Sequence, residues 1–136
     1  MPTIVNLVET GVYVDDLGRA EAFYRDVLGL DLIGREPGRH VFFRVGRDDV
    51  LLLFRAEGTS RGDHLPAHGA VGPGHFALGV PAGSLDDWRR HLQGHGVVIE
   101  READWPRGGR SLYFRDPAGN SVELITPGLW GLPSGW

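Results

Sequence analysis

The chain has 136 residues, which is enough for one compact domain with a sizeable core and too few for two conventional ones. Its formal net charge of −4, with arginine and acidic residues interspersed, favours neither nucleic acid nor an anionic membrane as a partner, and the absence of cysteine excludes disulfides, thiolate metal sites and a cysteine nucleophile. No apolar run approaches the roughly 20 residues of a membrane span and the N-terminus lacks the pattern of a secretory signal, so we expect a cytoplasmic protein.

The first half of the chain is predicted to fold as a strand, a helix and three strands. Residues 4–14 are apolar and β-branched, which favours a strand, and Asp15 or Asp16 can cap the helix that follows. That helix, at about 17–28, has an apolar stripe at helical spacing and ends at Gly29. Three short strands are expected next, at 31–35, 39–45 and 50–54.

The second half repeats that order. A strand is predicted at 75–80, and Ser84 with Asp87 has the pattern of a capping box at the start of a helix that ends near residue 94. Three more strands are expected at 97–100, 110–115 and 121–126. We therefore predict a single domain with a first module at about 4–55, an irregular linker at about 56–73, a second module at about 74–127 and a tail at 128–136.

An internal repeat supports the prediction of two modules. Val14 and Val80 lie 66 positions apart, as do Ile33 and Ile99. After a five-residue insertion near Trp105 the offset becomes 71, which pairs Arg39 with Arg110 and Phe43 with Phe114. Self-similarity at a fixed offset is typical of duplicated units. The expected fold is of the α+β class, with two paired βαβββ modules forming a curled mixed sheet around a cavity and the helices outside.

Three polar residues occupy predicted strands and have the chemistry of metal ligands. Glu9 and His75 are 66 positions apart and so occupy equivalent strands, while Glu123 lies on the final strand and has Leu52 as its counterpart. An ionised glutamate in the middle of a strand is costly to bury unless it is paired or binds a metal. One imidazole nitrogen and two carboxylates suit Zn²⁺, Mn²⁺, Fe²⁺, Ni²⁺ or Co²⁺.

Simpler interpretations exist for these and other polar residues. A single histidine such as His75 is more often a hydrogen-bonded core residue than a ligand, and Glu9 can simply pair with an arginine. His40 suits either general acid–base chemistry or an exposed surface. His64 and His68 lie four positions apart in the linker, but without a helix or a cysteine this spacing is weak evidence for zinc.

Three stretches give the chain a resemblance to the vicinal-oxygen-chelate superfamily of glyoxalases, bleomycin-resistance proteins and extradiol dioxygenases: ETGVYVDDLGRAEAFYRDVLGL, GPGHFALGV and SLYFRDPAGNSVELI. The resemblance covers about residues 5–126. It implies metal ligands on the first strand of each module and on the last strand of the second, which here are Glu9, His75 and Glu123. Members commonly have histidine or glutamine at the first position, so glutamate is a departure. Leu52 stands where four-ligand members have a carboxylate, so the ligand count resembles that of fosfomycin-resistance thiol transferases and ring-cleaving dioxygenases.

The function that this resemblance implies is that of a divalent-metal-dependent enzyme acting on a small oxygenated molecule. The metal would act as a Lewis acid on two neighbouring oxygens, with Glu9 as a possible base. Two carboxylates cancel the charge of the ion, which favours isomerase, lyase or transferase chemistry over ring cleavage. The alternatives are an extradiol ring-cleaving dioxygenase and a non-catalytic small-molecule-binding dimer of the bleomycin-resistance type.

Substrate contacts and assembly complete the expectations. Tyr113 matches a cavity tyrosine of the fosfomycin enzymes, which implies a substrate contact. A core tyrosine whose hydroxyl is hydrogen-bonded within the protein is an equally good interpretation. Arg39 and Arg110 are candidate contacts for an anionic group, although arginines at strand ends are usually solvated. The tail has four large apolar residues, which predicts a homodimer: Leu129, Trp130, Leu132 and Trp136.

Overall fold

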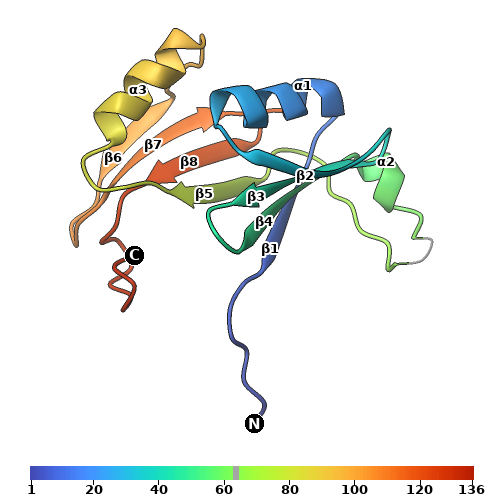
Figure 1. Ribbon diagram of the computed structural model, residues 1–136, viewed down its shortest axis with the longest axis horizontal. Helices are drawn as coiled ribbons and strands as arrows, with labels where there is room; N and C mark the ends of the chain where they lie inside the picture. The colour runs from blue at the N-terminus through green and yellow to red at the C-terminus, as the bar shows by residue number, and fades with distance from the viewer. Residues whose placement is uncertain (63–64) are drawn as a thin grey trace. The chain divides into compact units, whose positions relative to one another are not determined.

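The structure is a computed structural model, and it describes residues 1–62 and 65–136 (Figure 1). The chain divides into two compact units, Met1–Gly72 and Pro73–Trp136. Each unit has a four-stranded mixed sheet and a helix that packs on it, which confirms the predicted α+β class. In the described part of the chain, no helix is long and apolar enough to cross a membrane.

The first unit contains the elements β1 (Glu9–Tyr13), α1 (Leu17–Ala22), a π-helical turn (Phe23–Val27), β2 (Asp31–Glu36), β3 (His40–Val45), β4 (Asp49–Phe54) and α2 (Ala56–Thr59). The strand order is β1-β4-β3-β2, with β1 parallel to β4 and the other pairs antiparallel. As predicted, Asp16 caps α1, because its Oδ1 accepts a hydrogen bond of 3.0 Å from the backbone N–H of Arg19. The first strand is shorter than predicted, since its partner β4 begins only at Asp49 and leaves the residues before Val8 without a neighbouring strand in the ladder.

The second unit contains β5 (His75–Gly79), α3 (Leu85–Gly94), β6 (Arg101–Asp104), β7 (Arg110–Arg115) and β8 (Ser121–Ile125). Its strand order, β5-β8-β7-β6, repeats that of the first unit. Both units therefore have the predicted βαβββ order, and Figure 1 shows a helix lying along the sheet in each.

Three details of the prediction were wrong. The strand expected at 97–100 forms instead at Arg101–Asp104, because these residues pair with β7, and as an outer strand they need not be apolar. The capping box at Ser84 is not formed, since its hydroxyl donates to the carbonyl of Pro81 at 2.6 Å and makes no hydrogen bond to the helix. The linker is not wholly irregular, because it contains α2.

The registers of the two sheets repeat the offsets seen in the sequence. Glu9 lies opposite Val50 in the first sheet and His75 lies opposite Ser121 in the second, which are the same positions after shifts of 66 and 71. The hydrogen bond from Val14 N–H to Phe54 O also recurs, from Val80 N–H to Ile125 O. Side chains at equivalent positions therefore point to equivalent faces of the two sheets.

The helix-facing side of each sheet forms the core. In the first unit it is built from Val12, Val41, Phe43, Leu51 and Leu53 together with Ala20, Tyr24 and Leu28, all at most 6% exposed. In the second unit it is built from Phe76, Leu112, Phe114, Val122 and Leu124 together with Leu85 and Leu92, all at most 8% exposed. Because side chains alternate along a strand, the residues between these project from the face opposite α1 and α3, here called the helix-free face. The helix-free face has Glu9, His75, Tyr113 and Glu123.

Candidate functional site

In the second unit, Glu123 lies on β8 between its two neighbouring strands. Ala77 of β5 and Tyr113 of β7 are its register partners, so all three side chains share the helix-free face. Only 6% of Glu123 is exposed, and a carboxylate this buried needs polar partners.

Glu123 receives two hydrogen bonds at one carboxylate oxygen. The Ser111 hydroxyl donates to Oε1 at 2.5 Å and the Tyr113 hydroxyl donates to the same atom at 2.9 Å. Trp105 Nε1 in turn donates to the Ser111 oxygen at 2.8 Å. These contacts orient the carboxylate, and Oε2 is directed toward His75, whose Nε2 lies 3.4 Å away.

The other ring nitrogen of His75 determines its tautomer. Nδ1 lies 3.1 Å from the carbonyl oxygen of Ser121. A carbonyl can only accept, so Nδ1 has the proton, and in the neutral ring Nε2 has a lone pair. This lone pair faces a carboxylate oxygen, an arrangement that is attractive only when a proton or a metal cation lies on Nε2.

The turn between β7 and β8 holds the start of β5 in place. Asp116 Oδ1 accepts hydrogen bonds from the backbone N–H groups of Ala118 and Asn120, at 2.9 and 2.8 Å. The amide of Asn120 donates to Asp116 Oδ2 at 3.0 Å, and its Oδ1 accepts from Gly74 N–H at 2.7 Å. Since Gly74 directly precedes His75, this buried amide fixes the backbone that presents the imidazole.

Tyr113 is a protonated donor in this site. Burial raises the pKa of Tyr113, and the hydrogen bond that it donates to Glu123 raises it further. The neutral phenol therefore persists above the usual titration range of tyrosine and keeps its hydrogen bond to the carboxylate.

Trp136 covers one edge of the same face. Its indole lies directly against Gly79, where a Cβ would collide with the ring. Gly79 shares its strand face with His75 and Ala77. The tail therefore places an aromatic ring where β5 has no side chain.

Glu9 and Arg39 lie in the first unit, where both line a cavity of about 680 Å³. Arg39 Nε is 3.8 Å from Glu36 Oε2. His40 lines the same cavity. Burial lowers the pKa of His40, Glu36 raises this pKa and Arg39 lowers it. His68, from the predicted linker, also reaches this cavity, whereas His64 lies outside the described residues.

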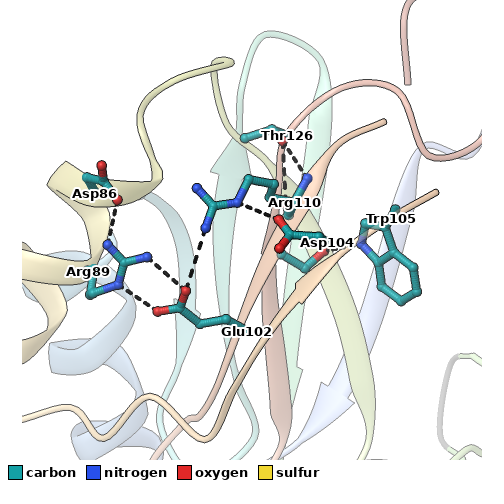
Figure 2. Close-up of polar contacts among 8 residues, drawn as sticks. Asp86, Arg89, Glu102, Asp104, Trp105, Arg110 and Thr126 are labelled. Atoms are coloured by element: carbon teal, nitrogen blue, oxygen red, sulfur yellow. Dashed lines mark hydrogen bonds and ion pairs between the residues drawn. The ribbon is translucent and has the colours of Figure 1, made fainter. Parts of the chain in front are cut away.

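Arg110 has a different setting, at the start of β7 in the second sheet (Figure 2). Its Nε donates to Asp104 at 2.7 Å, and its NH2 group lies 3.8 Å from Glu102. Glu102 also accepts two hydrogen bonds from Arg89, which reaches Asp86 at the start of α3 (Figure 2). This chain of ion pairs ties α3 to β6 and β7.

The predicted site residues thus fall into three places. His75, Glu123 and Tyr113 come together in the second unit, Glu9 and Arg39 lie on the cavity of the first, and Arg110 belongs to the ion-pair chain. Within either unit, the described residues contain no cluster of three or more histidine, aspartate or glutamate side chains suited to a metal ion. The predicted metal set of Glu9, His75 and Glu123 draws on both units and stays a prediction.

Sequence reasoning missed Ser111 and left open whether Trp105 lies at the pocket or at a dimer contact. Ser111 lies two positions before Tyr113 on the same strand, so strand alternation could have found it. Trp105 lies in the five-residue insertion within the second module, where no periodicity places a side chain.

Comparisons with known proteins agree with this fold. The family model described as the Glyoxalase/Bleomycin resistance protein/Dioxygenase superfamily matches residues 6–124. The chain is similar to a lactoylglutathione lyase from Agrobacterium tumefaciens whose crystal structure is known. The two sequences are 44% identical, the TM-score is 0.90, and the match covers 96% of this chain and 100% of that one.

Two further solved structures are similar in fold alone. A glyoxalase/bleomycin resistance protein/dioxygenase from Nocardioides is 24% identical with a TM-score of 0.75, covering 100% of this chain and 91% of that one. The fosfomycin resistance protein FosX from Mesorhizobium loti is 23% identical with a TM-score of 0.67, covering 93% and 96%. With a family match over most of its length and two repeated βαβββ units, the chain belongs to the Glyoxalase/Bleomycin resistance protein/Dioxygenase superfamily.

Proposed function

We propose that the chain is a metal-dependent enzyme of the glyoxalase type that acts on a small molecule with two neighbouring oxygens. The observation that carries this proposal is the contact between His75 Nε2 and Glu123 Oε2, at 3.4 Å. With Nδ1 committed to the Ser121 carbonyl, both facing atoms are electron-pair donors, which is the donor chemistry that a divalent cation requires. The 44% identity to a lactoylglutathione lyase supports the glyoxalase type of reaction.

In this proposal His75 and Glu123 hold the ion together with Glu9, and the ion is Zn²⁺, Mn²⁺, Fe²⁺, Ni²⁺ or Co²⁺. A bound divalent ion supplies Lewis-acid chemistry, because it polarises substrate oxygens. The protein's own groups do the rest. Ser111 and Tyr113 fix the carboxylate of Glu123 through Oε1, which leaves Oε2 for the ion. Glu9 is the candidate base that moves a proton of the substrate.

Metal content and turnover test this proposal together. Protein purified without chelator should contain close to one divalent ion per chain by elemental analysis. It should also isomerise the hemithioacetal that a ketoaldehyde such as methylglyoxal or phenylglyoxal forms with a thiol, and chelation should abolish turnover until a metal is restored. Metal-free protein that gains neither stability nor activity from any of these five ions would refute the proposal.

The rival function is a non-catalytic small-molecule-binding protein. The aromatic cavity of the first unit favours it, because ligand capture needs only such a cavity. A chain that binds small molecules but neither a metal nor a reactive substrate would fit this rival.

We also propose that the protein is a homodimer. Trp130 is 66% exposed and Leu132 is 52% exposed, which is more apolar surface than an isolated tail needs. Light scattering at micromolar concentration should give twice the 14.9 kDa mass of the chain, and a monomeric mass would contradict the proposal.

A further inference from the structure

The helix-free faces of the two sheets are equivalent in position and opposite in chemistry. By the offset of 71, Leu52 occupies the position of Glu123 and Phe42 occupies that of Tyr113. This face therefore has a carboxylate and a phenol in the second unit, where the first unit has an apolar and an aromatic side chain at the equivalent positions. Glu9 is the acidic residue on β1 of this face, at the position equivalent to His75.

A cavity of about 680 Å³ lies over this face of the first sheet. Its size falls in the range of small-molecule sites, which is roughly 300–1,000 Å³. Gly11 leaves the space open between Glu9 and Tyr13, since a Cβ there would already touch Phe54. The cavity is also lined by His68, whose Nδ1 lies 2.6 Å from the Tyr13 hydroxyl.

The cavity walls are aromatic rings set at steep angles to one another. Phe42 and Phe54 have centroids 5.5 Å apart and planes at 74°, and Phe54 meets His68 at 4.7 Å and the same angle. His40 stacks on Phe42 at 3.9 Å with an interplanar angle of 5°. Walls that meet edge to face offer both a ring face and ring edges to a flat guest, which is the geometry that aromatic pairs prefer.

The polar groups of the cavity disfavour an anionic guest, because Glu9 also lines it. Glu36 lies 3.8 Å from Arg39, so these two charges largely compensate each other. Because burial lowers the pKa of His40, its ring stays neutral near pH 7. Its buried Nδ1 has no hydrogen-bond partner in the described residues and lies 3.6 Å from Glu36.

We propose that this cavity binds the aromatic ring of the substrate, and that the substrate is a neutral molecule with two neighbouring oxygens beside that ring. The role of the oxygens rests on the proposed metal-dependent function. The ring-binding part does not, because every residue that lines the cavity belongs to the first unit.

Two neutral diols that differ only in the ring test the proposal: 1-phenyl-1,2-ethanediol and 1,2-propanediol. Their affinities would be measured by NMR titration of the full chain, with and without Zn²⁺. The phenyl compound should bind roughly tenfold to thirtyfold more tightly, because the ring buries more apolar surface. The chemical-shift changes that the phenyl compound causes should be largest at the backbone amides of Gly11, Leu52 and His68.

Phe42→Leu should remove most of this preference, because it keeps the apolar volume and loses the ring. Phe23→Leu is the matched control, since Phe23 is also half-buried but lies on the π-helical turn outside the cavity. It should keep the wild-type preference.

The outcomes separate the two proposals. Preference for the phenyl diol in metal-free protein supports the aromatic site even if no metal ever binds. Equal affinities, no saturable binding of the phenyl diol, a preference that survives Phe42→Leu, or shifts that fall outside the first unit would each overturn it. If Phe42→Leu fails to fold, the positions of the chemical-shift changes in the wild type test the proposed site instead.

Discussion

His75→Ala and Glu123→Ala should each abolish tight binding of a divalent metal ion. Each substitution removes one of the two electron-pair donors that face each other at 3.4 Å, and no neighbouring side chain that we describe in the second unit can replace it. We expect a loss of affinity of roughly a hundredfold or more, since supporting residues alone are typically worth 10–100-fold. Isothermal titration with Zn²⁺ on folded protein measures the effect.

Graded variants show whether the loss comes from the ligands themselves. Glu9→Gln should be milder, because an amide oxygen still coordinates although the charge and the base are lost. Tyr113→Phe should lower affinity about tenfold, because it removes one of the hydrogen bonds that orient Glu123. The exposed residues His95 and Glu57 provide the controls, and alanine at either should leave binding unchanged. Wild-type affinity in His75→Ala would remove the basis of the metal site.

Asn120→Asp should strongly destabilise the protein, although it only replaces the side-chain NH₂ group by an oxygen. The side chain is 1% exposed and its amide donates to the carboxylate of Asp116, itself 4% exposed, at 3.0 Å. Replacing that NH₂ group by an oxygen puts two carboxylates in contact away from water. We expect a loss of about 3–5 kcal/mol in the free energy of unfolding at pH 7, measured by urea denaturation.

Comparison variants separate charge repulsion from the loss of hydrogen bonds. Asn120→Ala loses the bonds to Asp116 and Gly74 without adding charge, so it should cost about 1–3 kcal/mol. Asn6→Asp makes the same change on an exposed residue and should alter stability by about 0.5 kcal/mol or less. If Asn120→Asp proved no worse than Asn120→Ala, repulsion at Asp116 would not be the cause.

Much of the fold could be predicted because it depends on local pattern and on repetition. The apolar stripe of α1 predicted a buried face, and Ala20, Tyr24 and Leu28 are buried as expected. The strand at β6 was misplaced because Val97 and Val98 look like strand residues. Val97 instead donates a backbone hydrogen bond to Leu92 at the end of α3, and Val98 is 79% exposed. The position of an outer strand such as β6 depends on which residues pair with β7, and the apolar content of the sequence does not show this pairing.

The candidate site was predictable in part for the same reason. Strand alternation and the repeat singled out His75 and Glu123, and the structure brings these two together. The repeat also exposes Leu52 as the counterpart of Glu123, from which an apolar face in the first unit could have been expected. His68 could not be found this way, because it reaches the cavity through the fold of the segment after β4, where its backbone N–H donates to the carbonyl of Thr59. Trp136 likewise reaches Gly79 only through the path of the tail.

The matched registers of the two sheets also bear on how such a chain evolves. An ancestor made of one module that paired with its own copy would have had the same residue at both members of every equivalent pair, since both halves came from one sequence. Fusing two modules removes that constraint, so that position 52 can be leucine while position 123 is glutamate. Selection can then adjust the apolar cavity through one half and the His75–Glu123 pair through the other, so a mutation that reshapes the cavity need not disturb that pair.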